Sequence, residues 1–332
     1  MMSVQITIIG LGQVGSSIGL ALAGQKNIKR VGHDKEFNVA RASQKIGAVD
    51  EIKFNLPASV SEANVVILSL PLSEIYATLG YIAQDLQEGT VILDTAPAKA
   101  TVAKWVSEKI PEECYYVGLS PAVGADYVHG VELGVDAARA DLFKEGQFLI
   151  NAPYGTPEEA VTLATDLTTL LGAKFTLTDS DEADGLLAAV HLLPQLAGAA
   201  LLNATASQPG CADARKVAAR PYATVTAAMA YHDEAKSLAE AALGNSANAV
   251  RALDAYIESL LKIRDRVADS DETSLTTLLE GAVKFRDRWL HERAAADWTP
   301  PREPNELDPQ TFGEKMGHMF FGNLLTRGKK GK

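Results

Sequence analysis

Short apolar runs without polar alternation recur along the first half of the chain. They lie at Val4–Ile9, Lys29–His33, Asn64–Leu70, Thr90–Asp94, Tyr115–Leu119 and Gln147–Ile150. Continuous apolar runs of this length are typical of parallel strands that are covered on both faces. Because stretches of helical period separate the runs, the pattern predicts βαβ units, an α/β fold and a doubly wound parallel sheet.

The pattern changes after residue 151. The segment Thr156-Pro157-Glu158-Glu159 has the residues of a helix start, and the helix it predicts ends at Gly172. One further strand is predicted at Lys174–Leu177. From Asp181 to Ala296 the chain is rich in Ala and Leu and almost free of helix breakers, which predicts an all-α second domain. We therefore divide the chain into an α/β domain at 1–178, a helical domain at 179–298 and a terminal segment at 299–332.

The terminal segment begins with a Pro-rich linker and ends in a basic tail. Four apolar residues fall on one helical face between them: Phe312, Met316, Met319 and Phe320. We interpret this segment as an arm that docks on its own subunit or on a partner. Contact with a lipid surface is the alternative, since basic residues flank the apolar face.

Composition excludes several classes of protein. Of 332 residues, 47% are hydrophobic, which is enough for real cores and rules out intrinsic disorder. The formal charge of −11 opposes nucleic-acid binding. Cys114 and Cys211 lack any metal-ligand or redox spacing, so no metal site is predicted. No basic leader and no apolar window long enough to span a bilayer were identified, which predicts a cytoplasmic protein without stable membrane insertion.

A glycine-rich turn follows the first predicted strand and opens a helix. Gly10-Leu11-Gly12-Gln13-Val14-Gly15 gives one glycine to a tight turn, one to close approach of a pyrophosphate and one to helix packing. Asp34 ends the next strand, at the distance expected for an acid that binds adenine ribose hydroxyls. The domain 1–178 is thus a predicted dinucleotide-binding Rossmann domain. Its cofactor-binding residues are Gly10, Gly12, Gln13, Val14, Gly15, Asp34, Leu70 and Pro71.

The charge of Asp34 sets the expected cofactor. A carboxylate opposes a ribose 2′-phosphate, so NAD is favoured, while the neighbouring His33 and Lys35 leave NADP open. Leu70-Pro71 ends a predicted strand at the carboxyl edge of the sheet, where folds of this kind place their ligands.

These segments, with Asp94–Lys99, Gly118–Gly124 and Asp141–Phe143, resemble the prephenate and arogenate dehydrogenase family over most of residues 4 to 205. The resemblance implies a Rossmann domain joined to a dimerising helical domain, with the active site in the cleft between them. It implies NAD(P)-dependent oxidative decarboxylation of a cyclohexadienyl substrate in tyrosine biosynthesis. In the family, a His polarises the ring hydroxyl and a cationic side chain of the helical domain binds a substrate carboxylate.

The sequence departs from the family pattern at the expected chemistry. Ser120 stands where the family motif has its His, and a serine cannot replace imidazole as a general base. Pro97 replaces a motif Ser between Asp94 and Lys99. His129, in the loop after Ser120, is a candidate for the missing imidazole if that loop folds back.

The helical domain offers further candidates by resemblance. In His191-Leu192-Leu193-Pro194-Gln195, His191 aligns with a family Ser, and a shift of one residue would align it with a family His. We place it in the cleft, with a hydrogen-bonded core histidine as the alternative. Lys216 aligns with the family's carboxylate-binding Arg, with Arg215 and Arg220 as alternatives; a solvated basic turn is an equal interpretation.

Three functions follow from these residues. The first is a prephenate or arogenate dehydrogenase that acts as a homodimer on a small carboxylate, with Ser120, His191 and His129 as candidate catalytic residues. The second is a dehydrogenase or reductase of the same two-domain plan with another substrate. The third is a dinucleotide-binding protein without catalysis, which the substitutions at Ser120 and Pro97 favour.

Overall fold

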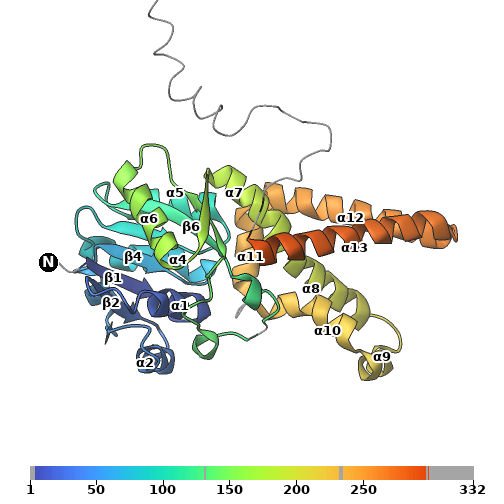
Figure 1. Ribbon diagram of the computed structural model, residues 1–332, viewed down its shortest axis with the longest axis horizontal. Helices are drawn as coiled ribbons and strands as arrows, with labels where there is room; N and C mark the ends of the chain where they lie inside the picture. The colour runs from blue at the N-terminus through green and yellow to red at the C-terminus, as the bar shows by residue number, and fades with distance from the viewer. Residues whose placement is uncertain (1–3, 131, 232–234, 297, 299–332) are drawn as a thin grey trace, which may run out of the picture. The chain divides into compact units, whose positions relative to one another are not determined.

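The computed structural model describes residues 4–130, 132–231, 235–296 and 298. Residues Met1–Ala296 form one compact unit, which contains both the sheet and the helices that follow it (Figure 1). The predicted arm with Phe312, Met316, Met319 and Phe320 lies outside the described residues. The domain boundary at residue 178 stays a prediction.

One sheet of eight strands is present in the described part of the chain. Its strands are β1 (Val4–Ile9), β2 (Ile28–His33), β3 (Glu51–Ile52), β4 (Val65–Leu68), β5 (Val91–Asp94), β6 (Tyr115–Ala122), β7 (Gln147–Asn151) and β8 (Lys174–Thr178). The order β3-β2-β1-β4-β5-β6-β7-β8 places the first strand beside β2 and β4. The predicted strands are confirmed to within a few residues. The two-residue β3 was missed because its length gives no hydrophobic pattern.

The predicted parallel sheet is confirmed, with one antiparallel pair. Strands β6 and β7 are antiparallel, with Ser120 opposite Leu149, while the other pairs are parallel. The chain from β6 to β7 turns back at the carboxyl edge without a crossover helix, so β7 must run in the opposite direction. This return places a long loop directly after Ser120.

Helices cover both faces of the sheet, as the doubly wound prediction required (Figure 1). Those before β8 are α1 (Gln13–Ala21), α2 (Phe37–Lys45), α3 (Leu56–Val60), α4 (Leu72–Ile82), α5 (Lys99–Lys109) and α6 (Glu158–Leu170), with short turns η1 (Ala83–Asp85), η2 (Ala125–Tyr127) and η3 (Val135–Ala137). Residues of α1, α2 and α6 share one core with the sheet. Residues of α3, α4 and α5 share a second core on the other face.

The chain after β8 is helical, as predicted. It consists of α7 (Ser180–Leu187), the π-helical turn η4 (Ala188–Leu192), α8 (Leu193–Ala206), α9 (Cys211–Val217), α10 (Arg220–Thr226), η5 (Ala227–Tyr231), α11 (Ala235–Gly244), α12 (Ser246–Ala268) and α13 (Glu272–Ala295). Leu192, Leu238 and Ala241 join the second core of the sheet. The helical region therefore packs on the face covered by α4 and α5.

The continuous helical stretch Ser180–Ala206 corrects one sequence-based expectation. By length and composition alone this stretch could cross a membrane, with a mean hydropathy of 1.7 over its most apolar window. The core helix of a soluble protein passes the same test. Here the stretch carries Asp184, which binds the start of α5, and Leu192, which lies in the second core. Only 22% of that apolar window is buried among the described residues.

Candidate functional site

The glycine turn lies at the carboxyl end of β1 and leads into α1. Gly10 has φ +91°, and a Cβ at this position would lie 2.1 Å from the Ser69 carbonyl oxygen. A Cβ on Gly15 would lie 2.0 Å from the Gly10 carbonyl oxygen. A Cβ on Gly12 would meet nothing within 4 Å. The first and third glycines are thus required by packing, whereas Gly12 leaves open space at a helix N-terminus, where a pyrophosphate fits.

Asp34 braces this turn. One carboxylate oxygen accepts from the Leu11 amide at 2.8 Å and the other accepts from the Glu36 amide at 2.8 Å. The remaining lone pairs of the carboxylate can accept ribose hydroxyls. Lys35 forms an ion pair with Glu74, and His33 Nδ1 lies 2.9 Å from the Lys53 carbonyl oxygen. The two neighbours that left NADP open therefore both have protein partners.

The other predicted cofactor residues lie at the same edge of the sheet. The Leu70 side chain lies 3.0 Å from a Cβ built on Gly10, and Pro71 precedes the first residue of α4. The Gln13 amide donates to the Ala137 carbonyl at 3.3 Å, which holds the loop between β6 and β7 against α1. Val14 is half-buried against the first core. The structure thus brings the predicted cofactor residues together around one turn.

A fully buried lysine lies at the carboxyl ends of β5 and β6. Lys99 Nζ donates to Asp94 Oδ1 at 3.0 Å, to the Asp94 carbonyl at 3.2 Å and to the Leu119 carbonyl at 2.6 Å. Burial lowers the pKa of Lys99 and the Asp94 carboxylate opposes that effect. Three acceptors match the three hydrogens of an ammonium group, so this geometry suits charged lysine. Lys99 thereby ties β5 to β6 directly before Ser120.

The Asp94 carboxylate has a second partner in the core. Tyr116 donates its hydroxyl to Asp94 Oδ2 at 2.6 Å. Burial raises the pKa of Tyr116 well above its ordinary value, and the nearby carboxylate adds to the effect. Asp94 is thus held between a lysine and a phenol, which makes it a structural carboxylate of the strand ends.

Asp184 of α7 caps α5 from the helical region. Its carboxylate accepts from the Lys99 amide at 2.6 Å and from the Ala100 amide at 3.0 Å. Burial raises the pKa of Asp184, while these amides act in the opposite direction. Asn245, just before α12, donates its side-chain amide to the Asp184 carbonyl at 2.7 Å. Asp184 therefore joins α5, α7 and the base of α12.

Ser120 lies within β6, and its side chain is buried with 7% exposure of the residue. Its Oγ has no hydrogen-bond partner among the described residues. The same holds for Asn151 Oδ1, which lies across the strand pair beside Gly118, and for Gln195 Oε1 on α8. A buried hydroxyl without a partner is costly unless a ligand or water satisfies it. Ser120 Oγ therefore keeps hydrogen-bonding capacity that no described residue uses.

The two candidate histidines have different surroundings. His191 is half-buried in η4, and its carbonyl accepts from Gln195 Nε2 at 2.7 Å. The π-helical turn adds weight to this position, since such turns are frequent at functional sites. His129 is exposed and follows η2 in the loop after Ser120.

The three predicted carboxylate-binding cations are exposed. Lys216 pairs with Asp213 of its own helix at 2.7 Å, and Arg215 is its neighbour in α9. Arg220 begins α10. Figure 1 shows α9 at the end of the helical region that lies away from the sheet. The structure does not bring these cations to the glycine turn, because α8 leads away from the sheet and α9 lies at its far end (Figure 1).

Sequence reasoning missed a different cation, Arg293. It lies in the last turn of α13, is 7% exposed, and donates from Nη2 to the Val123 carbonyl in the segment that follows Ser120. It is 170 residues from its partner in the chain. In the sequence, Arg293 is one of several charged residues on a helix whose apolar and charged residues are interspersed, so the pattern does not indicate this contact.

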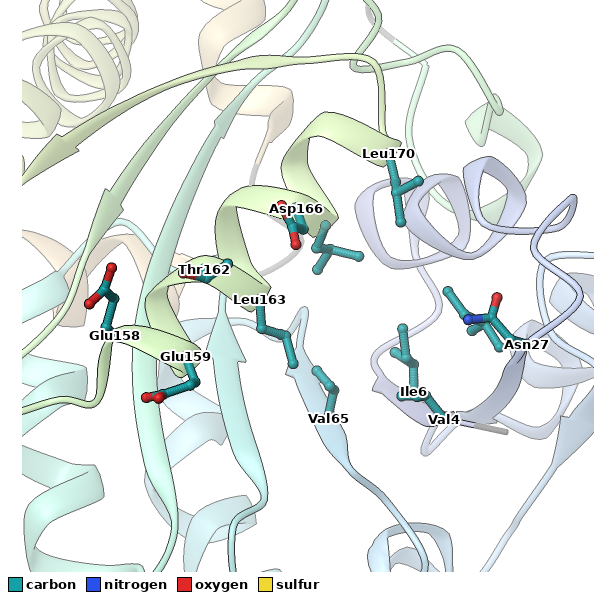
Figure 2. A pocket seen from close by; sticks show the side chains of 12 residues that line it. Val4, Ile6, Asn27, Val65, Glu158, Glu159, Thr162, Leu163, Asp166 and Leu170 are labelled. Atoms are coloured by element: carbon teal, nitrogen blue, oxygen red, sulfur yellow. The ribbon is translucent and has the colours of Figure 1, made fainter. Parts of the chain in front are cut away.

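A groove of about 580 Å³ lies elsewhere on the sheet. Figure 2 shows Leu163 of α6 facing Val65, with Val4 and Ile6 of β1 on the floor. These are residues near the amino ends of their strands, so the groove lies at the edge opposite the glycine turn. It is therefore separate from the candidate site.

Fold and glycine turn together define a protein of the dinucleotide-binding class, built from a Rossmann sheet and a helical region. Residues 18–177 match the family model described as prephenate dehydrogenase, nucleotide-binding domain. The chain is 25% identical to prephenate dehydrogenase of Bacillus subtilis, over 85% of this chain and 75% of that protein. It is 24% identical to cyclohexadienyl dehydrogenase of Zymomonas mobilis, over 85% and 94%.

A solved structure shows the same fold. Prephenate dehydrogenase from Aquifex aeolicus, in complex with hydroxyphenyl propionate and NAD+, superposes with a TM-score of 0.74, 18% identity, and coverage of 87% of this chain and 99% of that one. The chain is similar to prephenate dehydrogenases in sequence and in fold, with the family model matching residues 18–177 of its 332. The resemblance found in the sequence is confirmed.

Proposed function

We propose that this protein catalyses the NAD-dependent oxidative decarboxylation of a cyclohexadienyl carboxylate, prephenate or arogenate. The observation that carries the proposal is the glycine turn, in which Gly12 alone leaves room for a pyrophosphate at the start of α1. The Aquifex neighbour that shares the fold is in complex with NAD+ and hydroxyphenyl propionate, whose aromatic ring resembles a product of such a reaction.

The residues present fit a dinucleotide. The amides at the start of α1 would hold its phosphates, and Asp34 would accept the adenine ribose hydroxyls. Bound NAD supplies the acceptor for the hydride that leaves the ring carbon bearing the hydroxyl. The electron pair of the departing carboxylate enters the ring as carbon dioxide leaves, and the hydroxyl proton must pass to a base.

Ser120 would hold the substrate hydroxyl. Its buried Oγ lacks a partner, and a hydroxyl can donate to or accept from the reacting oxygen. It cannot keep the proton near neutral pH, so the proton passes to water or to a histidine. Between the candidates, we propose His191, which is half-buried on the helix that joins the sheet's second core, over the exposed His129.

The test is NADH formation on mixing the protein with NAD and prephenate or arogenate, with carbon dioxide release as the second readout. We expect turnover with at least one substrate. Ser120→Ala is expected to lower kcat by about tenfold to a hundredfold with NAD affinity unchanged, because one hydrogen bond to the reacting group is lost. His191→Ala should lower turnover and His129→Ala should not. The reverse result would make His129 the proton acceptor.

A second candidate is a dinucleotide-binding protein without catalysis. Ser120 in place of the family's His favours it, since no imidazole stands at that position. NADH binding with no turnover on either substrate, or on a set of other hydroxy acids, would support this candidate. Turnover on another hydroxy acid alone would instead support a dehydrogenase of the same plan with a different substrate.

The carboxylate-binding cation is part of the proposal. Lys216 is our candidate by resemblance, with Arg215 and Arg220 as alternatives, although all three are exposed in this chain. An exposed cation on α9 suits a carboxylate-binding site that a second subunit completes. We further propose a homodimer, because large apolar side chains on α12 and α13 are exposed, among them Ile257 at 51% and Val283 at 59%. A cytoplasmic location is part of the proposal and rests on the similarity to biosynthetic enzymes.

A further inference from the structure

The segment Leu119–Val123 is held at both ends by buried cations. Lys99 Nζ donates to the Leu119 carbonyl at 2.6 Å, and Arg293 Nη2 donates to the Val123 carbonyl. Ser120, with its unpartnered Oγ, lies between these two anchors. The first anchor belongs to the α/β part of the chain, whereas the second comes from the last helix of the helical region.

The end of α13 is itself fixed to the sheet. Lys174 of β8 donates its Nζ to the Ala296 carbonyl at 2.7 Å, three residues beyond Arg293. Burial lowers the pKa of Arg293 below its ordinary value, yet a guanidinium stays charged at physiological pH. A charged donor to a backbone carbonyl is stronger than a neutral one, and the planar guanidinium fixes direction as well as distance.

The chain directly beyond Val123 is tightly packed at Gly124. The Gly124 amide donates to the Leu142 carbonyl at 2.7 Å, and a Cβ on Gly124 would lie 2.4 Å from the Lys144 carbonyl oxygen. After this point the loop becomes exposed around His129 and Gly130. Arg293 therefore acts at the boundary between the buried strand and the exposed loop.

We propose that Arg293 is a positioning residue: from the end of α13 it fixes the Ser120 segment, so that helical region and strand β6 keep one relative arrangement. Its effect on turnover rests on the proposed dehydrogenase function, whereas its effect on the order of the segment does not. Arg293 is not a catalytic residue, because it acts on the backbone at Val123 and not on substrate.

The experiment compares Arg293→Gln and Arg293→Lys with Arg288→Gln, an exposed arginine on the same helix. Hydrogen exchange is followed in a peptide spanning residues 119–130 of the full-length protein, alongside the thermal midpoint. In Arg293→Gln we expect exchange of that peptide to rise at least tenfold, with an intermediate rise in Arg293→Lys, which keeps the charge but not the fork. Arg288→Gln should match the wild type.

Kinetics gives the second readout. For Arg293→Gln we expect kcat to fall about tenfold, with the affinity for NADH within twofold of wild type, because the glycine turn is not touched. Arg293→Lys should recover part of kcat. Should Arg293→Gln not fold, Arg293→Lys carries the same comparison against Arg288→Gln.

Unchanged exchange at 119–130 in both Arg293 variants, or an equal rise in Arg288→Gln, would overturn the inference. The two proposals fail in different ways. A wild-type protein without turnover, whose Arg293 variants still lose protection, sinks the proposed function and leaves the positioning role standing. Turnover in the wild type, with unchanged protection and unchanged kcat in the Arg293 variants, overturns the positioning role and leaves the proposed function standing.

Discussion

At the scale of single residues, the glycines of one turn have different roles. Gly10 and Gly15 are required by backbone atoms that would lie within 2.1 Å of an added Cβ. Gly12 has no such neighbour, and its place at the start of α1 leaves room for the pyrophosphate that this motif binds. The motif thus separates into two packing glycines and one binding glycine.

Gly12→Ala should therefore weaken NAD binding while leaving the fold intact. We expect an increase in the dissociation constant of about tenfold or more, because the methyl group occupies the space for the pyrophosphate. Calorimetric titration with NADH measures it. Gly24→Ala is the matched control, since a Cβ there also meets nothing within 4 Å. Equal affinities in both variants would show that the pyrophosphate does not approach Gly12.

The buried polar residues at this scale divide between structure and function. Lys99 and Asp94 hydrogen-bond to each other and leave no buried side-chain donor or acceptor without a partner. Ser120 Oγ, in contrast, has no partner among the described residues. Sequence resemblance placed Ser120 at the reacting centre. The missing partner of its hydroxyl is the structural reason to keep it there.

At the scale of elements, Arg30 of β2 bonds both the α1 backbone and Asp50, the residue before β3. Arg30 donates from Nη1 to the Gly19 carbonyl at 2.9 Å and from Nη2 to Asp50 at 2.5 Å. Burial alone would raise the pKa of Asp50, but the hydrogen bonds and charge of Arg30 outweigh it, so the pKa lies below its ordinary value of 3.8. The ion pair with Asp50 thus holds Arg30 in place, and Arg30 in turn bonds the helix that follows the glycine turn.

This pair predicts a pH dependence of stability. As pH falls, the unfolded chain protonates Asp50 first, so the contribution is fully present above pH 3.8 and is lost as pH falls through the lowered folded pKa. Asp50→Asn should lower the free energy of unfolding at neutral pH by about 1 kcal/mol, since the carboxylate is partly exposed. Urea unfolding at neutral and acidic pH measures the difference.

The difference between Asp50→Asn and wild type should shrink below pH 3.8. Asp166→Asn, at an exposed position on α6, serves as the control. A constant difference at every pH would mean that Arg30 does not act through the charge of Asp50.

At the scale of the whole molecule, the long hairpin of α12 and α13 exposes large apolar side chains. Beyond Ile257 and Val283 they include, among the described residues, Val250, Leu260, Leu261, Val267, Leu279, Phe285 and Trp289. An apolar surface of this kind marks an interface, and a second copy of the chain is our proposed occupant.

Charge placed on this surface should dissociate the proposed dimer. We expect Ile257→Glu combined with Val283→Glu to sediment as a monomer at concentrations where wild type is a dimer, because two carboxylates per chain would be buried without partners. Tyr81→Glu is the control, because Tyr81 is an exposed aromatic residue of α4 in the α/β part of the chain, outside the α12–α13 hairpin. Wild type that sediments as a monomer would remove the dimer proposal.

Local pattern was enough to predict the strands, the glycine turn and the helical second half. Apolar runs and glycine spacing act over a few residues, so β1, its turn and α1 could be recognised together. The direction of β7 could not, because an antiparallel return and a crossover leave the same apolar run in the sequence. The contacts of the apolar stretch Ser180–Ala206 could not be predicted either, because its composition does not reveal that Asp184 binds the start of α5 or that Leu192 joins the second core.

The sequence by itself determined the α/β class, the dinucleotide turn with Asp34 and the resemblance to one dehydrogenase family. Only the tertiary structure decided that Lys99 and Asp94 form a buried pair, that Asp184 caps α5 and that Arg293 reaches Val123, while Lys216 stays exposed. The physical reason is chain separation. A hydrogen bond between residues 170 positions apart leaves no periodic trace, since it depends on where packed helices end.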